Sequence, residues 1–590
     1  MAGVMYYPYM ASIAGKKRGT ATYYYLVESA RVNGQPRIIS QEYLGTAEEL
    51  AAAMRGGGLG LPDKTRHKEF GAAAATWGML EDLGVTAIID EVAGPRPAGQ
   101  PLSTGTYLAL AALNRLVAPC SKAAFADWWK TTAADRFTKV PAAALDHRRF
   151  WDAMHAVTVE QLEEISQKIA VTIVQSAGVD VSSVALDMTN FATFIDTANG
   201  RAPVAQRGKA KQKRSDLRLV GLGLAVTRDG GIPLTWHAYP GNKPDVTQFP
   251  AMITQLRGQY QAVCAAAGVP AAAADMTVVS GAGQNSEANF THLAAAGLHY
   301  IGSVPASDCP DLTALPASKR SVVDKDRFGG LTAYDTRRDV YGAQRRVILT
   351  HSPELRDSQA RGFDGTTLAK AGHKLGELAA TLARGKTRRG KDKVIAEIEA
   401  ITAKPWVRRV IRWQLDGDQP RDLRLSWHVD QQARTALEEE IFGKHVLITD
   451  HDDWPVPEVV AGYRSQSEAE FSFRQMKDTH VVSFSPMHHW TEHNVRVHVF
   501  TCVLALQLAH LMRLRAARAR LPMSVRELLR ELARIGETSC STTATAAGPE
   551  PTACSPRPPQ SRTSSPASSG SPATPPSADM GNTPKLPPAP

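Results

Sequence analysis

The chain has 590 residues, which is too long for one ordinary domain, so we expect two or three folded parts. Hydrophobic residues make up 43% of it, enough for a substantial core, and the net charge of +10 fits a polyanionic partner without establishing one. The six cysteines form no C-x-x-C pair, so the sequence indicates neither a zinc ribbon nor a disulfide framework.

The first part of the chain changes from strand to helix. Residues 20–45 alternate as strands do, and Asn33-Gly34 between two β-rich runs predicts a hairpin within an N-terminal region, 1–66. From 67 to 180 apolar residues recur at helical spacing, which predicts a helical domain.

The centre of the chain predicts a mixed α/β sheet, because three strands come first and strand–helix–strand units follow. We assign residues 181–304 to the first part of this core. Its expected strands and helices are, in chain order, strands 182–195, 217–227 and 232–239, helix 247–267, strand 276–279, helix 286–296 and strand 299–304.

Residues 305–445 look like an insertion with hairpin-like and Lys/Arg-rich stretches, before a strand at 445–450. A second part of the core, 446–537, is expected to be mainly helical. Its apolar stretch, 495–514, is interrupted by charged and polar residues, so we expect a buried helix and no membrane partner. Residues 538–590 are rich in Ser, Thr, Pro and Ala, which predicts a disordered tail.

Asp187 is the first candidate for chemistry, because a lone acid in an apolar strand is costly unless it is paired or bound to a metal. A strand-edge aspartate that faces solvent is the alternative. Tyr463, Glu470 and Lys477 are spaced by seven, which places them on one helix face, with Arg474 one turn beyond the glutamate. That face suits a metal ligand surrounded by phosphate contacts, although an exposed, salt-bridged helix has the same spacing.

The Tyr463, Glu470 and Lys477 pattern resembles the Y-x-x-R-x-x-x-E-x-x-x-x-x-x-K signature of DDE insertion-sequence transposases, with Gln466 at the arginine position. Asp187 in LDMTNF resembles the first aspartate strand of that family. The resemblance runs from about residue 10 to 537. Other passages that carry it are LDHRRFWDAM (145–154), HAYPGNKPD (237–245), FGKHVLITD (442–450) and PMHHWTEHNVRVHVF (486–500).

The resemblance implies an RNase H-like mixed sheet, interrupted by a β-rich insertion before the glutamate helix. It implies two Mg²⁺ (or Mn²⁺) ions, held by Asp187 and Glu470 among others, that support DNA cleavage and strand transfer. The implied partners are double-stranded DNA, namely the terminal inverted repeats of the element and the target, and a second copy of the chain in the synaptic complex. The helical region 67–180 becomes the candidate for binding the element ends, and the implied location is the bacterial cytoplasm, at the nucleoid.

The family's second catalytic aspartate falls on Gly281 in TVVSGAGQNSEANF, and glycine has no oxygen to offer a metal. Three neighbours are poor substitutes. Asp275 lies at the opposite end of the strand, Ser280 is expected to point to the other face, and Asp308 follows the next strand. We therefore expect cleavage activity to be low or absent.

A basic run in the loop after the first core strand is a candidate DNA-backbone contact. It comprises Arg207, Lys209, Lys211, Lys213 and Arg214, and a second run covers 386–393. A solvated surface is the alternative for both. The histidines between 480 and 498 fit no metal motif, so we expect them to pack or to form hydrogen bonds.

The sequence thus predicts a DDE transposase with an impaired site. A non-enzymatic DNA-binding protein derived from a transposase is the alternative function, and a related metal-dependent nuclease is a third, less favoured one.

Overall fold

The computed structural model describes residues 10–19, 21–32, 35–55, 64–209, 211, 214, 216–270, 276–541 and 553–554. The chain divides into two compact units. One comprises Met1–Glu69 with Ile535–Gln560, and the other comprises Phe70–Arg534 with Ser561–Pro590.

The first unit contains two small antiparallel sheets. Strands β1 (Met10–Arg18), β2 (Ala21–Val32) and β3 (Gln35–Thr46) form one of them, and helix α1 (Ala47–Arg55) follows. Val32 pairs with Gln35, as the expected hairpin requires, although Asn33 and Gly34 themselves lie outside the described residues.

The second small sheet pairs a strand from the N-terminal part of the chain with strands from its C-terminal part. Strand β4 (Lys64–Glu69) pairs with β16 (Gly536–Ser541), which also pairs with the short β17 (Ala553–Cys554). Disorder was expected from residue 538 onward, but residues 538–541 form part of a strand. Backbone hydrogen bonds to β4 order them, and hydrophobic composition does not report such bonds. The remainder of the expected tail lies outside the described residues.

The second unit is built on a nine-stranded mixed sheet of order β10-β11-β12-β15-β9-β8-β5-β6-β7. Strands β5, β8 and β9 are parallel to one another, and the pairs on either side of them are antiparallel. The expected strands are confirmed within one or two residues. The bounds are β5 Ser183–Thr193, β6 Arg218–Thr227, β7 Pro233–Pro240, β8 Thr277–Ser280, β9 His299–Val304, β10 Ser321–Val322, β11 Thr332–Val340, β12 Ala343–His351 and β15 Lys444–Thr449.

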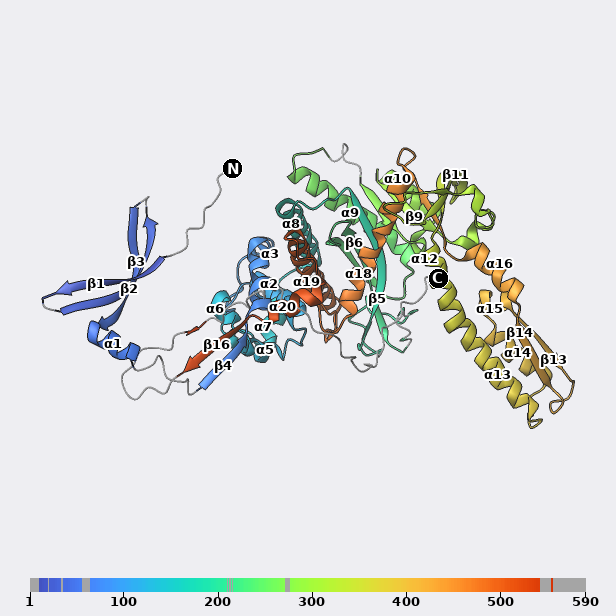
Figure 1. Cartoon of the computed structure of the whole chain (residues 1–590), viewed down its shortest axis with the longest axis horizontal. Helices are drawn as coiled ribbons and strands as arrows, with labels where there is room; N and C mark the ends of the chain where they lie inside the picture. The colour runs from blue at the N-terminus through green and yellow to red at the C-terminus, as the bar shows by residue number, and fades with distance from the viewer. Residues whose placement is uncertain are drawn as a thin grey trace, which may run out of the picture. The chain divides into compact units, whose positions relative to one another are not determined.

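Helices cover both faces of this sheet. On one face α9 (Asp245–Ala266) and α10 (Glu287–Ala295) pack against Val184, Leu186 and Met188 of β5. On the other face α18 (Gln466–Lys477) lies against β5, with Ala185 and Phe191 in the shared core (Figure 1). The odd-numbered residues of β5 therefore face α18, because side chains alternate along a strand.

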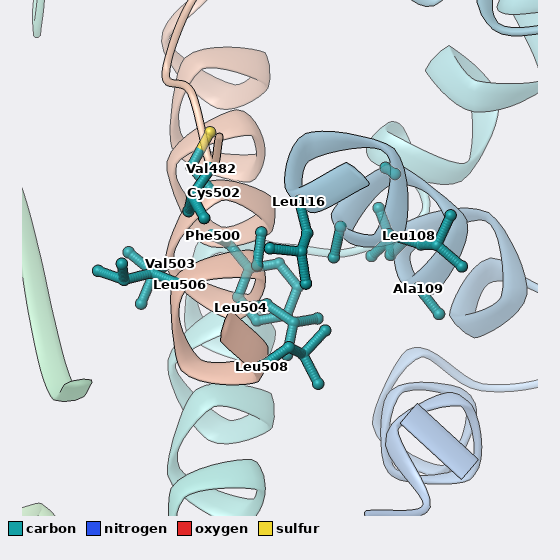
Figure 2. Packing of buried hydrophobic residues seen from close by; sticks show 14 of the residues in the cluster. Leu108, Ala109, Leu116, Val482, Phe500, Cys502, Val503, Leu504, Leu506 and Leu508 are labelled. Atoms are coloured by element: carbon teal, nitrogen blue, oxygen red, sulfur yellow. The ribbon is translucent and has the colours of Figure 1, made fainter. Parts of the chain in front are cut away.

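A helical bundle adjoins the α18 face. Its core is the contact between α4 and the long helix α19 (Glu492–Arg518), where Phe500 and Leu504 lie near Leu116 (Figure 2). Helix α19 is long and apolar enough to cross a membrane, but 94% of its apolar window is buried inside the protein. The other helices of this face are α2 Gly71–Asp82, α3 Val85–Ala93, α4 Thr104–Val117, α5 Phe125–Thr131, α6 Ala134–Thr138, α7 His147–His155, α8 Val159–Ala177, α17 Val456–Arg464 and α20 Val525–Ala533.

The insertion differs from the expected one in extent and in composition. Strands β10 to β12 belong to the main sheet, so the inserted segment runs from Ser352 to Gly443. A shorter excursion that contains α11 (Pro310–Thr313) connects β9 to β10. The inserted segment is mainly helical, and α13 runs beside its one hairpin (Figure 1). Its elements are α12 Pro353–Gly362, a π-helix at Phe363–Leu368, α13 Ala369–Ala383, α14 Lys391–Ile401, α15 Pro405–Val410, β13 Ile411–Asp416, β14 Arg424–Val429 and α16 Gln431–Ile441.

The expectation of a β-rich insertion was wrong because the β11–β12 hairpin, which supplied its strand pattern, packs in the main sheet. Val347 and Leu349 join the core on one face of that sheet, and Ile348 joins the core on the other. The inserted segment has a separate core, which includes Leu375, Leu382 and Ile398.

The insertion should be removable without loss of the sheet. The Ser352 N–H donates to the Gly443 carbonyl (2.8 Å), and His351 pairs with Lys444, so the two ends of the insertion already meet. We expect a chain with Asn-Gly in place of residues 353–442 to keep cooperative thermal unfolding, measured by near-ultraviolet circular dichroism, because a two-residue turn can join adjacent antiparallel strands. Loss of the cooperative transition would contradict this.

Candidate functional site

Two positions at the carboxyl ends of parallel strands define the site. Leu186 of β5 is in register with Ser280 of β8, so the next residues, Asp187 and Gly281, are neighbours on strands about 4.8 Å apart. Both positions face the helices α17 and α18, since Ala185 and Val279, two residues earlier, contribute to the cores on that face.

Asp187 is a half-buried acid surrounded by other charges. The pKa of Asp187 is raised from its ordinary value to about 6, mainly by burial and also by the Glu470 and Asp245 carboxylates. The Lys211 ammonium and the Met188 amide oppose the rise. The alternative of an edge-strand position is wrong, because β5 lies between β8 and β6 inside the sheet, but the Asp187 side chain keeps partial access to solvent.

Glu470 reaches the site from α18. Its carboxylate is exposed, and it raises the pKa of both Asp187 and Tyr463. Tyr463 belongs to α17, which ends at Arg464, so the expected single helix is two helices separated at Ser465. The Ser465 hydroxyl donates to the Gly462 carbonyl (2.6 Å), a bond that competes with the backbone ladder at this point.

Two side chains of α18 attach the helix to β5. The Lys477 ammonium donates to the Thr189 hydroxyl (2.8 Å), and burial lowers the pKa of Lys477 while Asp187 raises it. The Gln466 amide donates to the Leu186 carbonyl (3.1 Å). Gln466, at the arginine position of the signature, thus serves here to hold the helix against the strand.

Lys211 and Asp245 form an ion pair that the sequence did not predict at this site. The Lys211 ammonium donates to the Met188 carbonyl (2.5 Å) and to Asp245 (2.9 Å). The Tyr239 hydroxyl donates to the other Asp245 oxygen (2.8 Å), and burial together with Asp245 raises the pKa of Tyr239. Lys211 was expected to contact DNA, but its ammonium group faces the protein. The HAYPGNKPD motif (237–245), which ends at Asp245, was the sequence feature that could have placed Asp245 at this site.

Nothing in the fold requires glycine at position 281. Its backbone is extended (φ −80°, ψ 170°), and a Cβ added there would meet only the Gln284 Oε1, at 3.7 Å. That amide oxygen is buried and has no hydrogen-bond partner. A side chain can therefore begin at this position without a clash at its Cβ, on the strand next to Asp187.

The proposed substitutes for the second aspartate do not supply it. Asp308 lies on the surface in the turn after β9, where its charge acts on Tyr341, and it does not affect Asp187. Ser280 shares the face of Leu186, as expected. Asp275 lies outside the described residues. Asp187 and Glu470 remain as donors, since both Asp245 oxygens are bound by Lys211 and Tyr239 and position 281 offers no oxygen, and this set does not fit a two-metal centre.

The remaining basic residues of the first run lie on the surface. Arg207, Lys209 and Arg214 are exposed, and Arg214 pairs with Asp216, while Lys213 lies outside the described residues. Arg474 is exposed on α18, with its guanidinium over the Phe471 ring at 5.9 Å. In the second run, Arg389 pairs with Glu397 and Lys391 with Asp418.

A separate His/Asp cluster lies at the opposite ends of the parallel strands. His299, Asp450 and His451 bring their ligand atoms within 4.8 Å of one another, a group that could hold a metal ion. It is hydrogen-bonded, with His299 Nδ1 3.0 Å from Asp450 and His451 Nε2 2.8 Å from the Thr277 hydroxyl.

The histidines singled out in the sequence behave as expected at two positions. His493 and His498 form hydrogen bonds to the Met154 and Phe484 carbonyls, at 2.7 Å and 2.8 Å.

Comparison with known proteins leaves the family open. No family model matches the sequence, and no curated protein sequence matches it. Among solved structures, the chain is similar to piggyBac transposase in a cryo-EM structure of its synaptic complex with hairpin DNA. The identity is 9% and the TM-score 0.34, over 78% of this chain and 79% of that one. A similarity at this level neither places the chain in a family nor assigns an activity.

The Asp187 charge should destabilise the metal-free protein at neutral pH. The folded-state pKa of Asp187 is raised to about 6, so ionisation of this group lowers the free energy of unfolding. This loss is absent below about pH 4, grows between about pH 4 and 6, and is complete above about pH 6. We expect Asp187→Asn to increase the free energy of unfolding at pH 7.5 by up to about 3 kcal/mol, and to leave it unchanged near pH 4. Denaturant titration in a chelating buffer measures both values.

Asp216→Asn is the matched control, since Arg214 holds the pKa of this exposed carboxyl low, at about 2. It should not increase stability at either pH. If Asp187→Asn instead lowers the free energy of unfolding at pH 7.5, the Asp187 charge does not destabilise the metal-free protein and the prediction is wrong.

Proposed function

We propose that the protein is a DNA strand-transfer protein of the insertion-sequence transposase type, with the nine-stranded sheet as its RNase H-like core and with cleavage impaired at Gly281. The observation that supports this is the register of β5 and β8, which puts Asp187 beside Gly281. Glu470 reaches the same place from α18 and acts on the Asp187 charge. Three positions from separate elements thus converge, as metal-dependent phosphoryl transfer requires.

The missing carboxylate decides the activity expected of this site. In an intact site, Mg²⁺ or Mn²⁺ ions activate the attacking oxygen and stabilise the leaving one. Gly281 supplies no ligand, so we assign no cleavage step to the chain as it stands. We propose that Lys477, held by Thr189 beside Asp187, contacts a phosphate, whereas the Tyr463 hydroxyl lies 3.3 Å from His445 Nε2 within the protein.

Double-stranded DNA is the proposed partner. Arg207, Lys209 and Arg214 are exposed on the loop between β5 and β6, next to the site, and can contact backbone phosphates. Binding to the element ends should then weaken steeply as salt rises. Synapsis of two ends would require a second copy of the chain, in the bacterial cytoplasm.

A non-enzymatic DNA-binding function is the second candidate. The position of Lys211 favours it, since its ammonium group bridges the Met188 carbonyl and Asp245 and lowers the pKa of Asp187. A fixed cation of the protein thus provides part of the charge balance that a metal ion would provide.

Restoring the carboxylate should restore cleavage. We expect Gly281→Asp to raise Mn²⁺-dependent cleavage of labelled DNA carrying the element ends by more than about 100-fold, since loss of even an outer-shell metal partner costs up to roughly that much. Gly283→Asp is the matched control. It adds the same charge to the same turn, in open space, two residues from the proposed site.

The outcomes separate the two candidates. Efficient cleavage by the unaltered chain would refute the impaired site. Salt-dependent DNA binding without cleavage by either Gly281→Asp or the unaltered chain would favour the non-enzymatic function. Cleavage restored by Gly281→Asp, and lost again on adding Asp187→Asn or Glu470→Gln, would support the transposase site. Circular dichroism should first establish that each variant is folded.

A further inference from the structure

A pocket lies away from Asp187 in the sequence, between the helical bundle and the loop that precedes α19. It has a volume of about 290 Å³. Arg115 near the end of α4 and Lys122 in the following loop line it from one side, and His488 and His489 line it from the other. Its lining includes no carboxylate.

The two cations in this pocket are buried without a counter-charge. Lys122 is 9% exposed, and its ammonium group has no hydrogen-bond partner among the described residues. Arg115 is 2% exposed and donates to the carbonyls of Cys120 (2.5 Å) and Ser483 (3.5 Å), but its Nε–H has no partner. Burying an unpaired cation costs several kcal/mol, so this arrangement favours an anion that the protein itself does not supply.

The Lys122 ammonium lies over the Phe150 ring, 5.2 Å from its centroid, but the pocket lining places no anion beside it. The pKa of Lys122 is lowered to about 7, mainly by burial and also by Arg115, while the Cys502 and Cys120 thiols oppose the fall. Burial, with Lys122 and Arg115, lowers the pKa of His489 to about 3, so its imidazole is neutral and can donate or accept a hydrogen bond.

The pocket matches a phosphate monoester in charge and in donors. Such a group carries about two negative charges and three acceptor oxygens at neutral pH, which two cations can balance. An ammonium, a free guanidinium N–H and imidazoles are the donors such oxygens require. A backbone phosphodiester carries one charge and would leave the pocket net positive. Trp151, 43% exposed, lies on the pocket lining and offers a face on which a base could stack.

We propose that this pocket is a binding site for a phosphate monoester, held by the Lys122 ammonium and the Arg115 guanidinium, with Trp151 as the stacking surface for an attached nucleoside. The ligand is a free phosphate ion or the terminal phosphate of a nucleic acid. The proposal does not depend on the transposase site, because none of its groups contacts Asp187 or α18.

Thermal unfolding of the full chain tests the proposal. Inorganic phosphate should raise the Tm of the unaltered protein by about 3 °C or more over potassium chloride of equal ionic strength. Lys122→Met should abolish this shift. In chloride its own Tm should equal or exceed that of the unaltered protein, because a buried unpaired charge has been removed.

The matched control is Lys130→Met, which removes an exposed lysine of the adjacent helix α5, paired with Asp127. It should respond to phosphate like the unaltered protein. If Lys122→Met does not fold, Lys122→Gln replaces the ammonium group by a neutral amide and serves the same purpose. Absence of a phosphate shift in the unaltered protein, or an equal shift in the Lys122 variant, would overturn the proposal.

A second arm identifies the source of the phosphate. A short oligonucleotide with a 5′-phosphate is compared with the same oligonucleotide ending in a 5′-hydroxyl. At least tenfold tighter binding of the phosphorylated one, lost in Lys122→Met, assigns the pocket to a nucleic-acid end. A Lys122-dependent shift with inorganic phosphate, without a preference between the oligonucleotides, assigns it to the free ion.

Discussion

A carboxylate on an interior strand is costly unless positive charge lies close to it, and Asp187 is such a carboxylate at the centre of the sheet. Two lysines meet it from different elements. Lys211 comes from the loop between β5 and β6, and Lys477 from the end of α18. Each lysine also bonds to the backbone or a side chain of β5, so the charge balance fixes the loop and the helix against the same strand. Local structure around the site thus follows from one desolvated charge.

The glycine at 281 changes that balance. A second carboxylate beside Asp187 would add a negative charge where two lysines already face three acids, Asp187, Asp245 and Glu470. The excess would call for a divalent ion. With glycine in its place, the two lysines face one acid fewer, so the excess negative charge of the resting site is smaller and its need of metal is less.

The sequence predicted much of this arrangement and missed the rest for physical reasons. The strand period and the spacing around Glu470 located β5, β8 and α18, because burial dictates those patterns. The alternation of apolar and polar residues in β11 and β12 predicted a hairpin, but it could not show which sheet the hairpin would join. Lys211 belonged to a run that resembles a solvated surface, and Asp245 to an ordinary helix start. The pocket at Lys122 joins segments more than 330 positions apart, a proximity that only the fold creates.

The hydrogen bond between Ser352 and Gly443 has a consequence for how the sheet can form. Strands β12 and β15 are separated by about ninety residues, and closing a flexible loop of that length costs roughly 2–3 kcal/mol more than closing a tight turn. A segment with its own core can order first and bring its ends together before the strands meet. Strands β12 and β15 can then pair as quickly as strands joined by a short turn, although they are distant along the chain. The folded insertion takes the place of that turn.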